Sequence, residues 1–184
     1  MAPKTIVSCA EFERLAGSLG PAELVDGEIV EMSPGGFTHS TVTSNIHYIL
    51  REFATRKRLG RVLTNELGIH VQQSPPRSRG ADVAFISYET LPAGEAPTGF
   101  LTFPPDLIVE VLGDDDTLAK LREKVGDYLR FGVRLVWIAD PRTRSVTCFA
   151  PGEPEKVVQG GESIDGSDVL PGFEIPVARF FEVE

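Results

Sequence analysis

The sequence has little cysteine and no long apolar stretch. Its two cysteines, Cys9 and Cys148, lie far apart, which leaves no disulfide framework and no C-x-x-C spacing for zinc. No segment approaches the roughly 20 consecutive apolar residues that cross a membrane, and the first residues lack the apolar core of a secretion signal. We therefore expect a cytoplasmic protein with reduced thiols and no membrane segment.

Motifs for the common nucleotide and hydrolase chemistries are also missing. The sequence contains no G-x-x-x-x-G-K-[ST] phosphate loop, no G-x-G-x-x-G dinucleotide turn, no G-x-S-x-G nucleophile and no H-E-x-x-H zinc pair. These absences exclude the main nucleotide-binding, serine-hydrolase and zinc-protease interpretations.

Acidic residues outnumber basic ones, with 27 Asp and Glu against 18 Lys and Arg and a net charge of −9. Because phosphate binding depends on clustered cations, this balance argues against a surface built mainly to hold nucleic acid. A local basic groove could still exist within an acidic surface. Carboxylates gathered around a divalent cation would also add to the negative count themselves.

The chain has the size and composition of one globular domain. It contains 184 residues, of which 41% are hydrophobic and 24% are charged. We expect a single domain over residues 1–184, because no linker, internal repeat or low-complexity segment marks a boundary.

The first half of the chain predicts a hairpin and then a long helix. Asp26-Gly27 stands between two short runs rich in β-branched residues over 24–30, which is typical of a two-residue hairpin turn. Apolar residues then recur at helical spacing from Thr38, a suitable N-cap, to Gly60. We therefore expect the chain to open with the hairpin and continue into a helix of about five turns.

The middle of the chain predicts three strands. Extended segments over 61–71 and 81–88, separated by turn-forming residues 73–80, indicate an antiparallel pair. A loop rich in proline over 91–105 leads to residues 106–112, whose nearly continuous apolar run is typical of a central strand.

A strand, helix and strand unit predicts a parallel pair at the centre of the sheet. Thr117 can cap a helix that Gly132 ends, and residues 134–141 form another buried strand after it. A right-handed crossover would bring that strand parallel to residues 106–112. Short strands or turns that cover an edge are expected over 145–150, over 156–159 and after Leu170. The fold class is therefore α/β, with a mixed β-sheet flanked by helices and an N-terminal β-hairpin.

Two acidic residues lie on strands that should pack against helices. Asp82 begins the second extended segment, and Glu110 lies inside the central apolar run. Burying a carboxylate is costly unless a cation or hydrogen bonds compensate it, and two such acids brought together would form the oxygen site that Mg²⁺ prefers. Asp82 could instead be a polar strand start beside a turn, and Glu110 could point outward at the end of its strand.

Lys124 and His39 could complete such a site. Lys124 falls about 90° from the centre of the apolar stripe of its helix, at the border of the buried and wet faces, so its ammonium could reach the Glu110 strand. A solvated helix lysine is the alternative. His39 lies in the first turn of the long helix, where a ring nitrogen could reach a phosphate or a metal-bound water. A surface or capping histidine is the commoner arrangement.

Other titratable residues have simpler interpretations. His47 and His70 have no partner at ligand spacing and are expected to be structural. Glu66 could add a carboxylate, although salt bridging is its commoner use. Asp114-Asp115-Asp116 directly follow the central strand, but three consecutive acids cannot all face one ion, so we interpret them as a helix N-terminus.

Several segments together resemble a known family. They are Glu23-Leu24-Val25-Asp26-Gly27-Glu28, His39, Ala81-Asp82-Val83-Ala84-Phe85, Asp106-Leu107-Ile108-Val109-Glu110-Val111-Leu112, Lys124 with Tyr128, and Gly132-Val133. Their order and spacing resemble the Uma-two family of bacterial endonucleases, which belongs to the PD-(D/E)XK superfamily. The resemblance extends from about Glu11 to Phe173 and implies a restriction-endonuclease-like core.

The resemblance also implies a catalytic site. Asp82 and Glu110 would bind Mg²⁺, with Mn²⁺ as an alternative. The substrate would be a nucleic acid, with DNA as the first expectation. Lys124 would replace the lysine that other members carry two residues after the glutamate, where this chain has Leu112. His39 matches a histidine typical of the family and would join the catalytic site.

The chain departs from the family pattern at two places. Ala81 stands where the family usually has proline, which should alter loop stiffness more than chemistry. Gly113-Asp114-Asp115 replaces the usual Ser-Pro-Ser, and its added negative charge would either strengthen ion binding or repel DNA.

The leading hypothesis is therefore a metal-dependent endonuclease that hydrolyses DNA phosphodiester bonds. A binding or scaffold protein that keeps the nuclease fold without turnover is one alternative, because fold does not establish function. A phosphoesterase acting on small nucleotides is another. The sequence leaves open whether the substrate is DNA or RNA and whether the protein is a monomer or a homodimer.

Overall fold

A mixed β-sheet with helices on both faces dominates the structure. The computed structural model describes residues 6–113 and 116–183. The elements are α1 (Cys9–Ala16), β1 (Ala22–Val25), β2 (Glu28–Glu31), α2 (Phe37–Lys57), β3 (Gly60–Gln73), β4 (Pro76–Ser87), β5 (Leu107–Val111), α3 (Leu118–Phe131), β6 (Leu135–Asp140), β7 (Ser145–Phe149), β8 (Lys156–Gln159), β9 (Ser163–Asp165), β10 (Glu174–Pro176) and the 3-10 helix η1 (Val177–Phe181). None of the helices described is long and apolar enough to cross a membrane.

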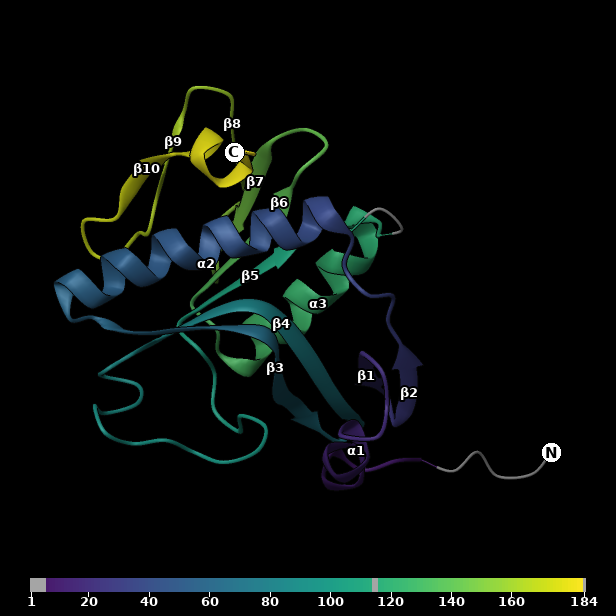
Figure 1. Cartoon of the computed structure of the whole chain (residues 1–184). Helices are drawn as coiled ribbons and strands as arrows, with labels where there is room; N and C mark the ends of the chain where they lie inside the picture. Colours follow the sequence, from purple (N-terminus) through teal and green to yellow (C-terminus); the bar gives the residue numbers. More distant parts are fainter. Residues whose placement is uncertain (1–5, 114–115, 184) are drawn as a thin grey trace.

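Within the described residues eight strands form one sheet, in the order β2-β1-β4-β5-β6-β7-β8, with β3 paired to β4 beside this path. β5 and β6 are parallel and are joined through α3, whereas β4 is antiparallel to β5. Figure 1 shows α2 and α3 on opposite sides of β5, with the β1–β2 hairpin at one side of the molecule. The predicted α/β class, mixed sheet and hairpin are confirmed.

β5 is buried on both faces because a helix covers each of them. Leu107 and Val109 belong to the core beneath α2, whereas Ile108 packs in the core beneath α3. The core beneath α2 is closed by the C-terminal residues, since the rings of Phe173 and Phe180 lie 6.1 and 6.2 Å from that of Trp137. The C-terminal residues after Leu170 therefore form part of the core in addition to covering an edge of the sheet.

The bounds predicted for α3 are confirmed by its caps. The Thr117 side chain accepts a hydrogen bond from the Lys120 amide, and Gly132 ends the helix with a left-handed φ of 112°. The bounds predicted for α2 are wrong by two or three residues. This helix starts after Gly36, which has no side chain to cap it, and ends before Arg58, whose left-handed φ of 56° stops the helix ahead of Gly60.

The chain opens with helix α1, so the expectation that it opens with the hairpin is wrong. Ser8 and Glu11 form a capping box, in which each side chain accepts a hydrogen bond from the backbone amide of the other. Cys9 and Phe12 bury one face of this short helix against Leu24 of the hairpin.

Strands β3 and β4 are longer than predicted. Residues 73–80 were expected to form a turn, but the pairing continues to Gln73 opposite Pro76. Because Arg77 and Arg79 are polar, this part of β4 lacks the apolar pattern that predicts a buried strand. Arg79 is nevertheless buried, because acidic side chains satisfy its guanidinium.

Gly60→Ala should disrupt the start of the β3–β4 pair that carries Asp82. A Cβ at Gly60 would lie 2.2 Å from the Ile86 carbonyl oxygen, and backbone cannot move aside as a side chain can. We expect urea unfolding to show a loss of about 1–3 kcal/mol in the free energy of unfolding. Gly20→Ala is the control, because a Cβ there meets nothing within 4 Å. Equal losses in both variants would contradict this account.

Candidate active site

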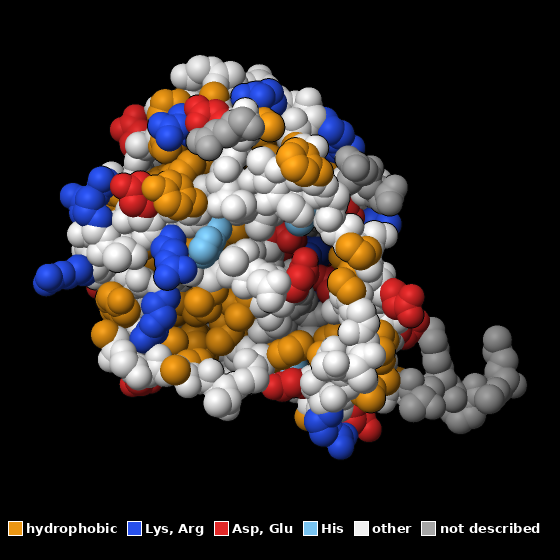
Figure 2. Space-filling model, viewed as in Figure 1, with side chains coloured by type: hydrophobic (Ala, Val, Ile, Leu, Met, Phe, Trp, Pro, Cys, Tyr) orange, Lys and Arg blue, Asp and Glu red, His pale blue; other side chains and the backbone are white. Residues whose placement is uncertain are grey.

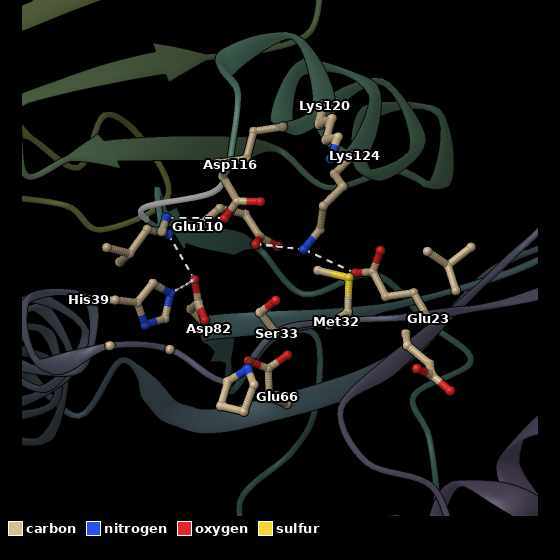
Figure 3. A pocket seen from close by; sticks show the side chains of 18 residues that line it. Glu23, Met32, Ser33, His39, Glu66, Asp82, Glu110, Asp116, Lys120 and Lys124 are labelled. Carbon is tan, nitrogen blue, oxygen red and sulfur yellow. Dashed lines mark hydrogen bonds and ion pairs between the residues drawn. The ribbon is translucent and has the colours of Figure 1, made fainter.

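A cavity of about 390 Å³ opens between the hairpin, α2, the sheet and α3. Its lining includes all four residues predicted for the site, His39, Asp82, Glu110 and Lys124. Figure 3 shows these side chains approaching from α2, β4, β5 and α3. Acidic side chains gather around the hollow in the space-filling view of Figure 2. The structure therefore brings the predicted residues together.

The sheet register sets the two acids beside each other. β4 and β5 are antiparallel with Val83 opposite Val109, so one further step along both strands leads to Asp82 and Glu110. The Val111 amide donates a hydrogen bond of 2.8 Å to Asp82 Oδ2. Asp82 and Glu110 are buried within their strands. The alternatives of a polar strand start for Asp82 and an outward-facing Glu110 are therefore wrong.

Lys124 supplies the cation that faces these strands. Its Nζ lies 2.7 Å from Glu110 Oε2, 3.0 Å from Glu23 Oε1 and 3.1 Å from the Gly80 carbonyl oxygen. An ammonium has three protons to donate, and these contacts use all three. Lys124 is only 8% exposed. The expected position at the border of the wet face is wrong, because the hairpin covers this part of the helix through Glu23.

Tyr128 completes the surroundings of Glu110. Its hydroxyl oxygen lies 2.7 Å from Glu110 Oε1 and 3.2 Å from the Gly80 carbonyl oxygen. One hydroxyl proton can serve only one of these acceptors, and the shorter contact is with the carboxylate. Both oxygens of Glu110 are thus engaged, one by Lys124 and the other by Tyr128.

His39 orients Asp82. Its Nε2 lies 3.3 Å from Asp82 Oδ2, and its side chain is 16% exposed, so the alternative of a surface or capping histidine is wrong. The hydrogen bond to Asp82 and the Asp82 charge raise the pKa of His39. Gly35 makes room for the ring, since a Cβ there would lie 2.5 Å from Nδ1 of His39.

Carboxylates outweigh cations at this cavity. Burial raises the pKa of Glu110 to about 8, with Lys124 opposing the shift and Asp82 adding to it. Partial burial and the charge of Asp82 raise the pKa of Glu66 at the rim. Burial alone would lower the pKa of Lys124, but the charges of Glu110 and Glu23 raise it well above its usual value, so Lys124 stays protonated.

The donor chemistry of the cavity fits a hard divalent cation. The carboxylates of Glu66, Asp82, Glu110 and Asp116 all line it, and carboxylate oxygens are the ligands that such a cation prefers. In the part of the chain that the structure describes, however, no group of three or more His, Cys, Asp or Glu side chains is arranged to hold a metal ion. Both oxygens of Glu110 instead contact side chains of α3, Lys124 and Tyr128.

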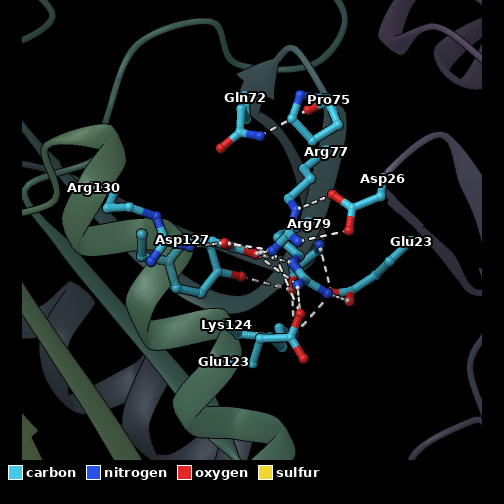
Figure 4. A network of polar contacts seen from close by, with 12 residues as sticks. Glu23, Asp26, Gln72, Pro75, Arg77, Arg79, Glu123, Lys124, Asp127 and Arg130 are labelled. Carbon is cyan, nitrogen blue, oxygen red and sulfur yellow. Dashed lines mark hydrogen bonds and ion pairs between the residues drawn. The ribbon is translucent and has the colours of Figure 1, made fainter.

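Glu23 is a site residue that sequence reasoning missed. It is 4% exposed, and its Oε2 lies 2.8 Å from Arg79, which in turn pairs with Asp127 of α3 over 2.6 Å (Figure 4). Burial would raise the pKa of Glu23, but Lys124 and Arg79 lower it. The one signal in the sequence for its burial is that Glu23 stands beside Leu24 in a short apolar strand.

Two acidic residues lie at the cavity in ways that the sequence did not predict. Asp116 directly precedes Thr117, the N-cap of α3, which agrees with its interpretation as part of a helix N-terminus, but it also lines the cavity and accepts a hydrogen bond of 3.1 Å from the Gly113 amide. Asp114 and Asp115, which carry the family departure, lie outside the described residues. Glu66 forms no ion pair with a described residue, so the salt bridge expected for it is absent there.

The two remaining histidines differ. His70 is structural, as predicted, because its ring nitrogens lie 2.8 Å from Ser78 Oγ and 3.0 Å from Glu13 Oε2. His47 was also expected to be structural, but it lines a second groove that adjoins the cavity.

The stability of the metal-free protein should fall as pH rises through neutrality. Because the pKa of Glu110 is about 8 in the folded state and 4.5 for a free group, its stabilising contribution is complete below pH 4.5 and is lost towards pH 8. In EDTA, the Tm of the wild type should therefore fall with rising pH relative to that of Glu110→Gln, whose amide stays neutral. A Tm difference that is constant over this range would contradict the prediction.

Comparison with known proteins agrees with the geometry. A model of the Uma2 family, described as "putative restriction endonuclease", matches residues 9–178. A crystal structure described as "a putative nuclease belonging to DUF820" from Anabaena variabilis has the same fold, with a TM-score of 0.81 at 17% identity over 95% of this chain and 97% of that one. No protein in the curated set matches the chain. The resemblance found in the sequence is thus confirmed, and the chain belongs to the Uma2 family.

Proposed function

We propose that this protein is a divalent-cation-dependent endonuclease that hydrolyses phosphodiester bonds in DNA. The observation that carries the proposal is the convergence of Asp82, Glu110 and Lys124 on one cavity from two strands and a helix. Membership of a family described as "putative restriction endonuclease" supports the same reaction class. Mg²⁺ is the cation we propose, with Mn²⁺ as the alternative, because the available ligands are carboxylate oxygens.

The contacts of each side chain suggest its role. Asp82 and Glu110 would hold the cation, and bound Mg²⁺ would supply charge neutralisation and a more acidic water. Lys124 places a positive charge where the phosphorane-like transition state gains negative charge. His39 keeps the Asp82 carboxylate oriented through its Nε2 contact.

Substrate binding must rearrange the hydrogen bonds of Lys124. All three of its protons are used, so a phosphate oxygen can be contacted only when one acceptor is released. The contact with the Glu23 carboxylate adds the attraction of an opposite charge, which a backbone carbonyl does not offer. The neutral Gly80 carbonyl is therefore the acceptor that we expect to be released first.

One observation favours a second candidate function, a phosphoesterase acting on small nucleotides. The cavity volume of about 390 Å³ lies in the range of small-molecule sites, and such a substrate needs no basic surface. The net charge of −9 equally favours a nuclease-fold binding protein without turnover. Substrate assays distinguish the endonuclease, the small-nucleotide phosphoesterase and the binding protein without turnover.

Cleavage of labelled DNA tests the proposed reaction. We expect the wild type to cut DNA with Mg²⁺ or Mn²⁺ and not in EDTA, and Asp82→Ala to abolish the cutting. Lys124→Met, which keeps most of the side-chain volume, should lower turnover by about two orders of magnitude or more, as the loss of a transition-state electrostatic contact does. Hydrolysis of nucleotides without cutting of DNA would favour the small-nucleotide phosphoesterase instead.

Lys156→Ala is the control for Lys124→Met. Lys156 is exposed on β8 and forms only a 3.7 Å pair with Asp165, so its loss removes the same charge away from the cavity. Lys120 would be a poor control, because it lines the cavity. Since Lys124 is buried between carboxylates, Lys124→Met will also lower the Tm, and rates must be compared well below the Tm of both variants. Equal loss of activity in both would remove Lys124 from the mechanism.

Asp82→Asn should raise the Tm in EDTA, because it removes a charge that raises the pKa of Glu110 and Glu66. Added Mg²⁺ should raise the Tm of the wild type by mass action, and this rise should be lost in Asp82→Asn. Asp165→Asn, at an exposed position on β9, should change neither result. A wild-type Tm that does not respond to Mg²⁺ would count against the metal site.

A further inference from the structure

A second groove leaves the cavity between α2 and β3. It has a volume of about 320 Å³ and shares Gly35, His39, Glu66 and Asp82 with the cavity. Its other lining residues carry hydroxyl, amide or imidazole groups, and they are Ser40, Thr43, Ser44, His47, Thr64 and Asn65. The groove therefore continues the cavity with neutral hydrogen-bonding groups in place of carboxylates.

Local geometry forms the two walls of this groove. On α2, His39, Thr43 and His47 follow one another at four-residue spacing, so they lie on one face of the helix. On β3, Asn65 and Glu66 have left-handed φ values of 77° and 54°, and the pairing with β4 shifts register at the same point. The resulting bulge separates the β3 backbone locally from its partner and exposes both side chains.

Two exposed aromatic rings lie on α2, the helix that forms one wall of the groove. Phe37 and Tyr48 of α2 are 79% and 67% exposed. Their separation of eleven positions corresponds to about 20° of rotation and roughly 16 Å along the helix, so both rings lie on the same face. Ser44, which lines the groove, lies between them on that face. A single exposed ring needs no explanation, but two on one face beside the candidate site suggest a ligand.

The charge distribution disfavours a duplex on this surface. The chain carries a net charge of −9, and Figure 2 shows Lys and Arg side chains scattered over the visible face without a continuous band. Duplex binding depends mainly on neutralising phosphates. A single strand, in contrast, also exposes its bases, which stack on aromatic side chains with little dependence on sequence.

We propose that the groove binds a single-stranded nucleic acid whose bases stack on Phe37 and Tyr48. Its backbone would contact the hydroxyl, amide and imidazole groups, which would lead the scissile phosphate to Asp82 and Glu110. The 16 Å between the rings accommodates several nucleotides at roughly 3.4 Å each. This inference rests on the proposed endonuclease function and deepens it by naming the substrate class.

Fluorescence anisotropy in EDTA tests binding without cutting. The full chain is titrated into one labelled oligonucleotide, either single-stranded or annealed to its complement. The single strand should bind at least about tenfold more tightly, and Phe37→Ala and Tyr48→Ala should each weaken its binding by roughly 5- to 100-fold, as loss of a stacking ring does. Phe37→Trp should restore binding. Because few phosphates are neutralised, the slope of log K against log salt should be no steeper than about −2.

Tyr88→Ala is the matched control, because Tyr88 is 38% exposed, follows β4 and lies against Arg61 outside the groove. It should leave binding unchanged. Equal affinity for the duplex, or an equal loss in Tyr88→Ala, would overturn the inference. It would also be overturned if Phe37→Ala and Tyr48→Ala change only the oligomeric state measured by light scattering, since the rings would then contact a second copy.

Cleavage is measured separately, so that the two proposals can fail independently. Tight, ring-dependent binding of the single strand without any cutting would refute the nuclease and keep the groove as a binding site. Cutting of duplex DNA at rates that Phe37→Ala and Tyr48→Ala leave unchanged would refute the groove and keep the nuclease.

Discussion

The buried ammonium of Lys124 is the contact on which the rest of the site depends. It links Glu110 of the central strand to Glu23 of the hairpin, and it is carried by α3. Leaving one member of a buried ion pair without its partner costs about 3–5 kcal/mol, so these three elements cannot separate independently. Strand β2 adds little apolar burial, because none of its residues is fully buried, and the apolar contact of β1 is made by Leu24 against α1. The attachment of the hairpin to α3 and to β4 therefore depends in part on charge, through Glu23 and its pairs with Lys124 and Arg79.

The same arrangement leaves the cavity short of positive charge. Lys124 and Arg79 compensate Glu23, whereas Asp82 has only the half-buried His39 beside it and Glu66 has no ion-pair partner among the described residues. Burial, with a smaller contribution from the charge of Asp82, raises the pKa of both Glu66 and Glu110. A divalent cation at the proposed site would supply the positive charge that these carboxylates lack. Part of the acidic character of the chain is thus concentrated at its candidate site.

Most of the candidate site could be predicted from the sequence because each of its residues interrupts a local pattern. Asp82 and Glu110 are carboxylates within apolar strands, and Lys124 lies beside the stripe of a well-capped helix. Glu23 and Arg79 could not be found in this way, since the burial of each depends on a partner 56 positions away. Their polarity indicated a solvated hairpin and a turn, whereas long-range ion pairing buries both. Helix α1 is a different case, because its capping box at Ser8 and Glu11 is a local signal that the sequence does contain.

The acidic surface also constrains how a substrate can be selected. A chain with a net charge of −9 repels polyanions at long range, so binding must depend on contacts that act over a few ångströms. The cavity of about 390 Å³ has room for a group of nucleotide size, and the groove beside it offers hydrogen bonds and exposed rings. In the proposed binding mode a flexible strand would enter the groove one nucleotide at a time, whereas a duplex would present its phosphates to the acidic rim first. Because repulsion acts on the phosphates and stacking acts on the bases, we expect the negative charge that weakens binding overall to increase the proposed preference for unpaired nucleic acid.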